Sequence, residues 1–244
     1  MTNSMKVSVI LPAAGLGTRM SRSAPEKSGV SRKQFMLLKD SPILVHTIRK
    51  FVNFPLVSDI VVALRADDLD WVEGLLREEN LSKPVRLVEG GDSRQLSVEN
   101  ALAVLDPATD LVAVHDAVRP FIEPQVLERL FKEAAETGAA IVGIVPVDTV
   151  KQVHLNKIQT TLSRERLILA QTPQVFRFDL LKRAFARARE DSFNGTDESS
   201  LVERLEEVEV SVVPGSDRNI KITRASDMEL AKLFLAEETV GVLG

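Results

Sequence analysis

Hydrophobic and polar positions along the chain follow two alternating patterns. Short apolar runs rich in β-branched residues are typical of strands buried in a parallel sheet. Longer stretches space their apolar residues three or four positions apart, which is typical of helices that cover a sheet. The patterns predict strands over residues 7–11, 60–64, 85–88, 111–114, 140–145, 174–176, 208–213 and 219–222. They predict helices over residues 42–52, 67–79, 92–105, 124–136, 178–189, 197–205 and 225–236. This order predicts an α/β fold, with a mostly parallel sheet between two layers of helices.

The alternation breaks after Pro146. Residues 147–169 are polar and roughly alternating, which predicts an extended hairpin that turns near residues 154–157. An isolated hairpin is at best marginally stable in water, so we expect it to pack against something. A second subunit is the favoured partner, because closed homodimers are the commonest oligomers. The alternative is a hairpin that lies on its own domain. We therefore expect one domain over residues 1–244, with an arm inserted at about 147–169.

Composition narrows the function classes. The formal net charge of −4 argues against a dedicated nucleic-acid binder. The chain has no cysteine, which excludes disulfides and thiolate metal sites and fits a reducing compartment. The first apolar run ends at Pro12, too early for a secretory signal, and no run approaches the length of a membrane span. We expect a cytoplasmic protein without a membrane or nucleic-acid partner.

The first predicted strand leads into the sequence Pro-Ala-Ala-Gly-Leu-Gly-Thr-Arg over residues 12–19. Its small side chains let the backbone approach a phosphate and direct N–H groups at the oxygens. Arg19 adds a permanent positive charge. Neither the dinucleotide fingerprint nor the P-loop motif is complete here. An ordinary glycine-containing turn is therefore the alternative to a triphosphate loop.

Two further segments directly follow predicted strands: Glu-Gly-Gly-Asp-Ser-Arg-Gln-Leu-Ser over 89–97 and His-Asp-Ala-Val-Arg-Pro over 115–120. A third, Asn-Ile-Lys-Ile-Thr over 219–223, places a lysine in a predicted apolar strand. In open α/β sheets, ligands bind outside the carboxyl ends of the strands. The joint placement of these segments therefore favours a functional site, in which a carboxylate at a strand end could hold Mg²⁺.

Each of these segments also has a simpler interpretation. In that interpretation, Asp92 does no more than cap the helix that follows it. Asp116 and Arg119 form a local ion pair without a ligand. Lys221 extends from an edge strand into solvent.

Together the segments resemble the 2-C-methyl-D-erythritol 4-phosphate cytidylyltransferase family. The matching stretches, in order from residue 11 to residue 223, are LPAAGLGTRM, KQF, GGDSRQLSVENAL, VHDAVRPF, PVDTVK, AQTPQVF, TDESSLVE and NIKIT. The resemblance implies a Rossmann-like three-layer nucleotidyltransferase fold and a homodimer joined through the 147–169 arm. It also implies transfer of CMP from CTP to the polyol phosphate, with release of pyrophosphate and with Mg²⁺ or another divalent cation.

The resemblance further implies roles for individual residues. The nucleotide would be bound by Pro12, Ala13, Ala14, Gly15, Gly17, Gly91, Asp92 and Ser97. The acceptor would be bound by Asp116, Ala117, Arg119 and Thr149, with Asp116 also at the metal. The catalytic cations would be Arg19, Lys33, Arg164 and Lys221. Thr149 and Arg164 lie on the arm and would reach the site of the neighbouring subunit.

Some alternatives stay open. Lys33 is assigned because Gln34 and Phe35 continue the family motif, and Lys27 is the competing loop lysine. A ribitol 5-phosphate-type cytidylyltransferase would share the fold and the nucleotide. A non-catalytic nucleotide-binding dimer is the alternative from another class. The charged set of Arg19, Lys33, Asp116 and Lys221 argues against it, because a scaffold does not need these charges.

Overall fold

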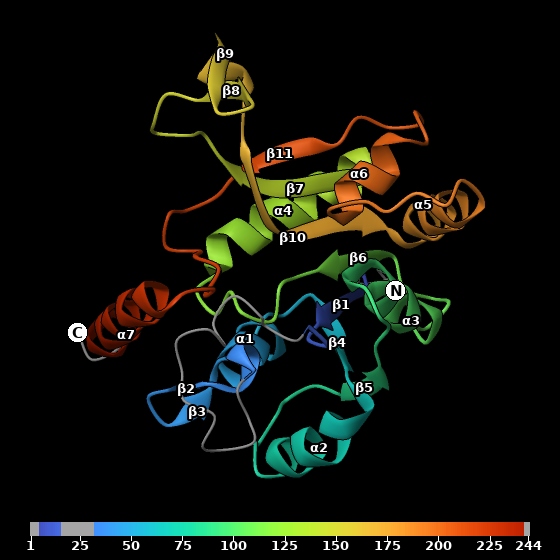
Figure 1. Cartoon of the computed structure of the whole chain (residues 1–244). Coiled ribbons are helices and arrows are strands. Elements are labelled where there is room, and N and C mark those ends of the chain that lie inside the picture. The colour runs from blue at the N-terminus through green and yellow to red at the C-terminus, as the bar shows by residue number, and fades with distance from the viewer. Residues whose placement is uncertain (1–4, 16–31, 242–244) are drawn as a thin grey trace.

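The computed structural model describes residues 5–15 and 32–241. A seven-stranded sheet with the order β11-β7-β10-β6-β1-β4-β5 forms its centre (Figure 1). Strand β10 runs antiparallel to both of its neighbours, and every other pair in this sheet is parallel. The strands are β1 (Val7–Pro12), β4 (Val57–Leu64), β5 (Val85–Glu89), β6 (Leu111–Val114), β7 (Ala139–Ile144), β10 (Leu169–Arg177) and β11 (Ser211–Pro214). The predicted mostly parallel sheet is confirmed.

Helices cover both faces of this sheet, because successive strand residues point to opposite sides. In β1, Val9 and Leu11 belong to one core while Ile10 belongs to the other. The first core receives α1 (Ile43–Val52), α2 (Leu69–Arg77) and α4 (Pro124–Thr137). The second core receives α3 (Arg94–Ala103), α5 (Phe178–Glu190) and α6 (Glu198–Glu203). The three-layer α/β architecture predicted from the sequence is therefore confirmed. Among the described residues, no helix is long and apolar enough to cross a bilayer.

The last helix, α7 (Ala225–Gly241), covers a third, smaller apolar cluster beside the sheet edge where the site lies. Met228 and Ala231 of α7 are buried there with Phe121 and Ile222. The short pair β2 (Leu37–Leu38) and β3 (Ser41–Pro42) leads into α1 and contributes Leu38 to the same cluster.

The predicted strand over residues 219–222 is wrong. This segment is irregular, and its one backbone–backbone hydrogen bond to the chain after β6 runs from the Ile222 N–H to the Val118 carbonyl, at 3.0 Å. Its apolar alternation reflects Ile220 and Ile222 packing into the cluster under α7 rather than into a sheet. The interpretation of Lys221 as a residue on an edge strand fails with it. The strand predicted over 208–213 is shorter, because β11 begins only at Ser211.

The predicted hairpin is confirmed as β8 (Lys151–His154) and β9 (Lys157–Thr161), joined by Leu155 and Asn156. Both turn residues have positive φ, of 47° and 61°, as a two-residue hairpin turn requires. The two strands form a sheet of their own, every residue in them is exposed, and the hairpin stands away from the main sheet (Figure 1). The hairpin therefore does not lie on its own domain.

Candidate active site

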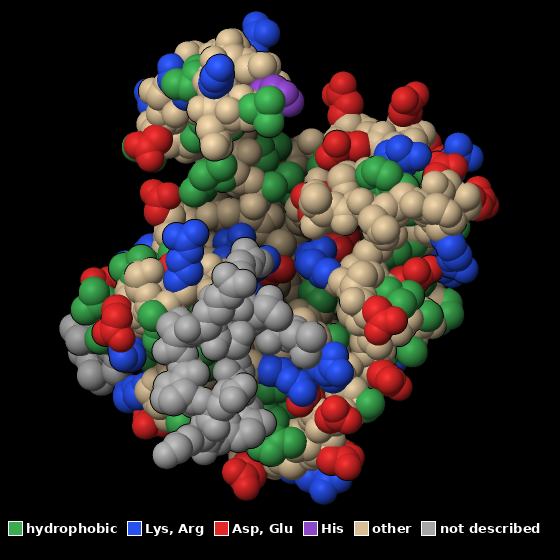
Figure 2. Space-filling view, viewed as in Figure 1, with side chains coloured by type: hydrophobic (Ala, Val, Ile, Leu, Met, Phe, Trp, Pro, Cys, Tyr) green, Lys and Arg blue, Asp and Glu red, His purple; other side chains and the backbone are tan. Residues whose placement is uncertain are grey.

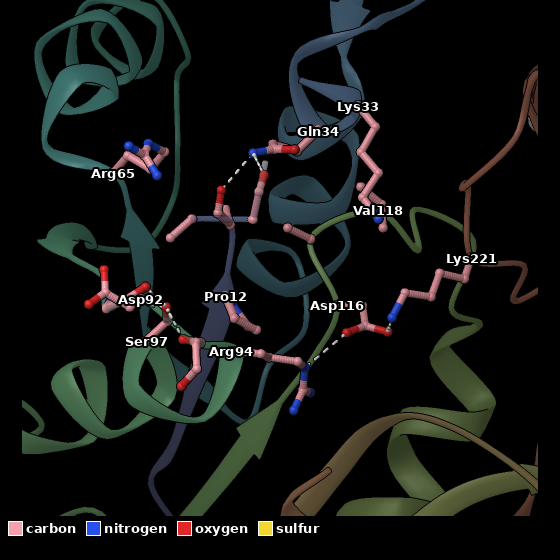
Figure 3. Close-up of a pocket in the computed structure, with 16 residues that line it drawn as sticks. Pro12, Lys33, Gln34, Arg65, Asp92, Arg94, Ser97, Asp116, Val118 and Lys221 are labelled. Carbon is pink, nitrogen blue, oxygen red and sulfur yellow. Dashed lines mark hydrogen bonds and ion pairs between the residues drawn. The ribbon is translucent and has the colours of Figure 1, made fainter. Parts of the chain in front are cut away.

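A cavity of about 430 Å³ opens at the carboxyl ends of β1, β4, β5 and β6, where an α/β sheet is expected to bind its ligand (Figure 3). Residues from six separate segments line it: Pro12, Ala13, Ala14, Gly15, Lys33, Gln34, Arg65, Gly91, Asp92, Ser93, Arg94, Ser97, Asp116, Ala117, Val118 and Lys221. Most of the predicted site residues thus share one cavity. Lys and Arg side chains border the hollow on the face shown in Figure 2.

The first wall is the loop after β1. The Ala13 N–H donates to the Ala63 carbonyl at 2.8 Å, so this loop begins as a continuation of the sheet. The buried Gln34 amide donates to the carbonyls of Ala13, at 2.6 Å, and Gly15, at 3.3 Å. A Cβ added to Gly15 would meet nothing within 4 Å, so the loop presents an open backbone surface there. The predicted residues Gly17 and Arg19, and the competitor Lys27, lie outside the described residues.

The second wall is the loop between β5 and α3. The Ser97 hydroxyl donates to the Ser93 carbonyl at 2.8 Å and accepts from the Gly91 N–H at 3.1 Å, which folds the loop over its own helix. A Cβ at Gly90 would lie 2.7 Å from the Ala14 Cβ. Glycine is therefore required at position 90 for the two loops to approach each other.

The helix cap differs from the sequence interpretation. Ser93, not Asp92, caps α3, because its side chain accepts from the Leu96 N–H at 3.0 Å. This leaves the exposed Asp92 carboxylate on the cavity wall without a capping role. The simpler interpretation of Asp92 as only a helix cap is therefore wrong.

Three cations converge on Asp116, directly after β6. The Lys221 ammonium lies 2.9 Å from Oδ2, the Arg119 Nε 3.2 Å from Oδ2, and the Arg94 Nε 3.5 Å from Oδ1. Burial alone would raise the pKa of the Asp116 carboxyl, but these cations outweigh it and hold that pKa well below its usual range. The carboxylate is consequently anionic at neutral pH.

The positions of Lys221 and Arg119 follow from local packing. Ile222 is fully buried, so it anchors the neighbouring Lys221 at the cavity wall. The Arg119 guanidinium donates to the Asn219 carbonyl at 2.7 Å as well as pairing with Asp116. The local Asp116–Arg119 ion pair predicted as a simpler interpretation therefore exists. Arg119 is absent from the cavity lining, and its role at the acceptor stays a prediction.

Sequence reasoning missed Arg94 as a functional residue. Its guanidinium donates to both carboxylate oxygens of Glu198 on α6, at 2.7 and 3.0 Å, and Glu198 is only 1% exposed. Burial would lower the pKa of Arg94, but the Glu198 and Asp116 carboxylates outweigh it and raise that pKa. Arg94 is therefore a fixed cation that links α6 to Asp116. Arg94 and Glu198 both lie in stretches that match the family, GGDSRQLSVENAL and TDESSLVE, and this match was the signal in the sequence that could have found them.

The loop that carries Asp116 is also held from β10. The Asp116 N–H donates to the Thr172 hydroxyl at 3.0 Å, and this hydroxyl lies 3.2 Å from Nδ1 of His115. His115 Nε2 lies 2.9 Å from the Arg119 carbonyl. Burial lowers the pKa of His115 to about 4, so the ring is neutral at pH 7. A neutral ring satisfies both contacts when Nε2–H donates to the carbonyl and Nδ1 accepts from Thr172.

Comparison with known proteins identifies the family. The family model described as 2-C-methyl-D-erythritol 4-phosphate cytidylyltransferase matches residues 7–237. The chain belongs to this family. A cytidylyltransferase of that name from Solibacter usitatus is 64% identical over 96% of this chain and 97% of its own length. One from Acidobacterium capsulatum is 49% identical over 96% of this chain and 99% of its own.

Solved structures of the family share the fold. The 4-diphosphocytidyl-2C-methyl-D-erythritol synthase of Anaerococcus prevotii superposes with a TM-score of 0.82, at 27% identity over 96% of this chain and 97% of that one. The Francisella tularensis cytidylyltransferase gives a TM-score of 0.77, at 33% identity over 93% of this chain and 99% of that one. The resemblance read from the motifs is confirmed. With it, the expectation of a nucleotidyltransferase that moves a cytidylyl group from CTP is confirmed.

Two residues predicted for this cytidylyltransferase lie away from the cavity of their own chain. Thr149 is exposed in the connection that leads into the arm, and Arg164 lies in the return connection at its base. The Arg164 guanidinium donates to the Val147 carbonyl at 2.6 Å. Neither residue lines the cavity. Their action in a neighbouring subunit stays a prediction.

Proposed function

We propose that the described cavity is where this chain transfers CMP from CTP to 2-C-methyl-D-erythritol 4-phosphate, giving 4-diphosphocytidyl-2-C-methyl-D-erythritol and pyrophosphate. The observation that carries this assignment is the convergence of Lys221, Arg119 and Arg94 on one buried carboxylate beside an open glycine loop. An anionic substrate that enters this cavity meets fixed positive charge at the end where the acceptor would bind. The family membership supplies the identities of the two substrates.

The chemistry needs positioning more than proton transfer. A phosphate monoester is largely dianionic at neutral pH, because its second pKa is about 6. One of its oxygens attacks the α-phosphorus of CTP, the bond to the bridging oxygen of the β-phosphate breaks, and pyrophosphate leaves. The negative charge that develops is stabilised by fixed cations, for which Lys221 and Lys33 are placed on the cavity wall. This account assigns no role to a general base, which agrees with a neutral, fully hydrogen-bonded His115.

A divalent cation fits this cavity as part of a nucleotide complex. Mg²⁺ is commonly held by one or two carboxylates together with substrate phosphates. Among the described residues there is no group of three acidic or histidine side chains that could hold a metal ion, so Asp116 would supply the protein's carboxylate. When bound there with CTP, the cation would neutralise triphosphate charge.

This donor set predicts that metal binding depends on CTP. Three cations already balance the Asp116 carboxylate, so the protein alone should leave the electron paramagnetic resonance signal of free Mn²⁺ unchanged. With CTP, the wild-type protein should alter the signal of the Mn²⁺–CTP complex and Asp116→Asn should not. Asp40→Asn, a change at an exposed carboxylate, is the matched control. Strong Mn²⁺ binding without CTP would reveal a resident site and contradict this arrangement.

Pyrophosphate release tests the assigned substrates. We expect release from CTP with methylerythritol phosphate, little release with ribitol 5-phosphate, and none without an acceptor. ATP and GTP should support far less turnover at equal concentration, because the Gly-Gly-Asp loop is expected to select the smaller pyrimidine. Faster turnover with ribitol 5-phosphate would favour the alternative acceptor. Equal turnover with ATP would remove the cytosine assignment.

The arm is proposed to complete the active site of a partner subunit in a homodimer. Six large apolar side chains on the arm and at its base are more than half exposed in the single protomer: Val145, Val147, Val153, Leu155, Ile158 and Leu169. Figure 2 shows hydrophobic side chains gathered on the arm and at its base. Such a patch is typical of an interaction surface. A partner that covers it would bring Thr149 and Arg164 toward a second cavity. We also keep the cytoplasmic location as a prediction.

Subunit mixing tests this arrangement. Arg164→Ala and Lys221→Ala should each be nearly inactive as homodimers. A heterodimer would contain one site with both native residues, so random exchange should restore about a quarter of the wild-type sites. Two Lys221→Ala preparations exchanged with each other provide the control. Lack of recovery after verified exchange would place Arg164 in the site of its own subunit.

A further inference from the structure

Arg65 stands between the two loops that form the nucleotide end of the cavity. It directly follows β4, which lies between β1 and β5 in the sheet. The Leu64 carbonyl accepts from the Gly90 N–H at 2.6 Å, and the Ala63 carbonyl accepts from Ala13. The end of β4 is therefore hydrogen-bonded to the start of both loops, and the next side chain, Arg65, lines the cavity between them.

The Arg65 guanidinium is unsatisfied within the described residues. Its Nε is buried, yet it has no hydrogen-bond partner there, and the side chain forms no ion pair with a described carboxylate. A buried donor without a partner costs free energy that a ligand can recover. The other arginine of the cavity lining, Arg94, behaves differently, because Glu198 and Asp116 hold it. Arg65 is thus a cation whose hydrogen-bonding capacity the described fold does not use.

Its location points to the base rather than the reacting phosphates. In Figure 3, Arg65 and Asp92 lie on one side of the cavity, while Lys33, Asp116 and Lys221 lie across it. The cations on that far side are placed for the triphosphate and the acceptor. The ligand group near Arg65 must offer hydrogen-bond acceptors, because a guanidinium only donates.

We infer that Arg65 is a specificity-determining residue that donates to the adjacent O2 and N3 acceptors of the cytosine ring. A planar guanidinium matches two neighbouring acceptors in a way that a lysine does not. Uracil keeps O2 but carries an N–H at position 3, which would place a donor against a donor. Arg65 would therefore favour CTP over UTP. This inference rests on the proposed use of CTP.

The test compares nucleotide binding by wild-type protein, Arg65→Ala and Arg65→Lys, with CMP, CTP and UTP titrated by calorimetry in the presence of Mg²⁺. Arg65→Ala should lower the affinity for CMP and for CTP by the same factor, about 10–100-fold, and should lower the affinity for UTP much less. Arg65→Lys should retain charge without restoring the preference for cytosine. Arg77→Ala, an exposed arginine on α2, is the matched control and should change none of these affinities.

Each outcome decides the inference. Equal losses of affinity for CMP and CTP in Arg65→Ala, together with a smaller preference for CTP over UTP, support a contact to the base. A loss confined to CTP would place Arg65 at the outer phosphates and overturn the inference. Unchanged affinities in folded Arg65→Ala would overturn it as well. Failure of the wild-type protein to bind CTP would instead contradict the proposed function, so the two failures are distinguishable.

Discussion

Lys221→Met is expected to lower kcat by about 10²–10³-fold while leaving the protein folded. The Lys221 ammonium lies at the cavity wall, 2.9 Å from the Asp116 carboxylate, where charge on the transferring phosphoryl group would develop. Methionine keeps much of the side-chain volume and removes the charge. Ile222 continues to anchor the segment, because its backbone hydrogen bond and burial do not involve Lys221. Steady-state kinetics at saturating CTP and acceptor measures the effect.

The matched control for this variant is Lys232→Met, which removes an exposed lysine of α7 that pairs only with Glu229 among the described residues. It should retain wild-type kcat. A Lys221→Met enzyme with unchanged kcat and only a raised KM would show that Lys221 binds substrate equally in the ground and transition states. That result would contradict its catalytic assignment.

Arg94→Met is expected to destabilise the fold by about 3–5 kcal/mol at pH 7, because it leaves the Glu198 carboxylate buried without its partner. Burial raises the pKa of Glu198, and removing Arg94 takes away the charge that opposes this rise. A carboxyl group whose pKa is higher in the folded state than in the unfolded state destabilises the fold at pH values above its folded-state pKa. This destabilisation disappears at pH values below the unfolded-state pKa, because the group is then protonated in both states. The stability deficit of Arg94→Met should therefore shrink as the pH falls toward 4.5.

The double variant Arg94→Met/Glu198→Met separates structure from catalysis. Replacing both members of a buried ion pair by apolar residues is often neutral for stability, so the double variant should regain most of what the single variant loses. Its turnover should stay low, because Asp116 has lost one of its three cations. Urea unfolding at pH 7 and pH 5, at matched protein concentration, provides the stability measurement. Equal stability of the single variant and the wild type would contradict the buried-pair account.

The sequence allowed much of the sheet to be predicted because its strands are buried on both sides. Runs such as Val7–Leu11 and Leu111–Val114 consist almost entirely of residues that pack in one of the two cores. The strand predicted over 219–222 was wrong because that prediction relied on the same apolar pattern. Its alternating apolar residues are buried, but against α7 instead of a neighbouring strand, and local pattern does not distinguish these partners.

The residues of the candidate site likewise fall into those that the sequence predicted and those that it did not. Residues that stand directly after strands, such as Gly15, Asp92 and Asp116, were found because strand ends of a parallel sheet share one edge. Gln34 and Arg65 were missed, because their importance depends on contacts that no periodicity records. Gln34 acts through a buried amide, and Arg65 through its position between two loops. The choice between Lys33 and Lys27 stays open, since only Lys33 lies within the described residues.

The central claim is that this chain forms a new phosphate–phosphate bond between the acceptor and the α-phosphorus of CTP. A ³¹P NMR spectrum of wild-type protein with CTP, methylerythritol phosphate and Mg²⁺ tests it most directly. The account predicts loss of both substrates' resonances and equal appearance of pyrophosphate and of a coupled pair of signals from a diphosphate diester. Appearance of inorganic phosphate or CMP instead, or an unchanged acceptor resonance, would contradict it.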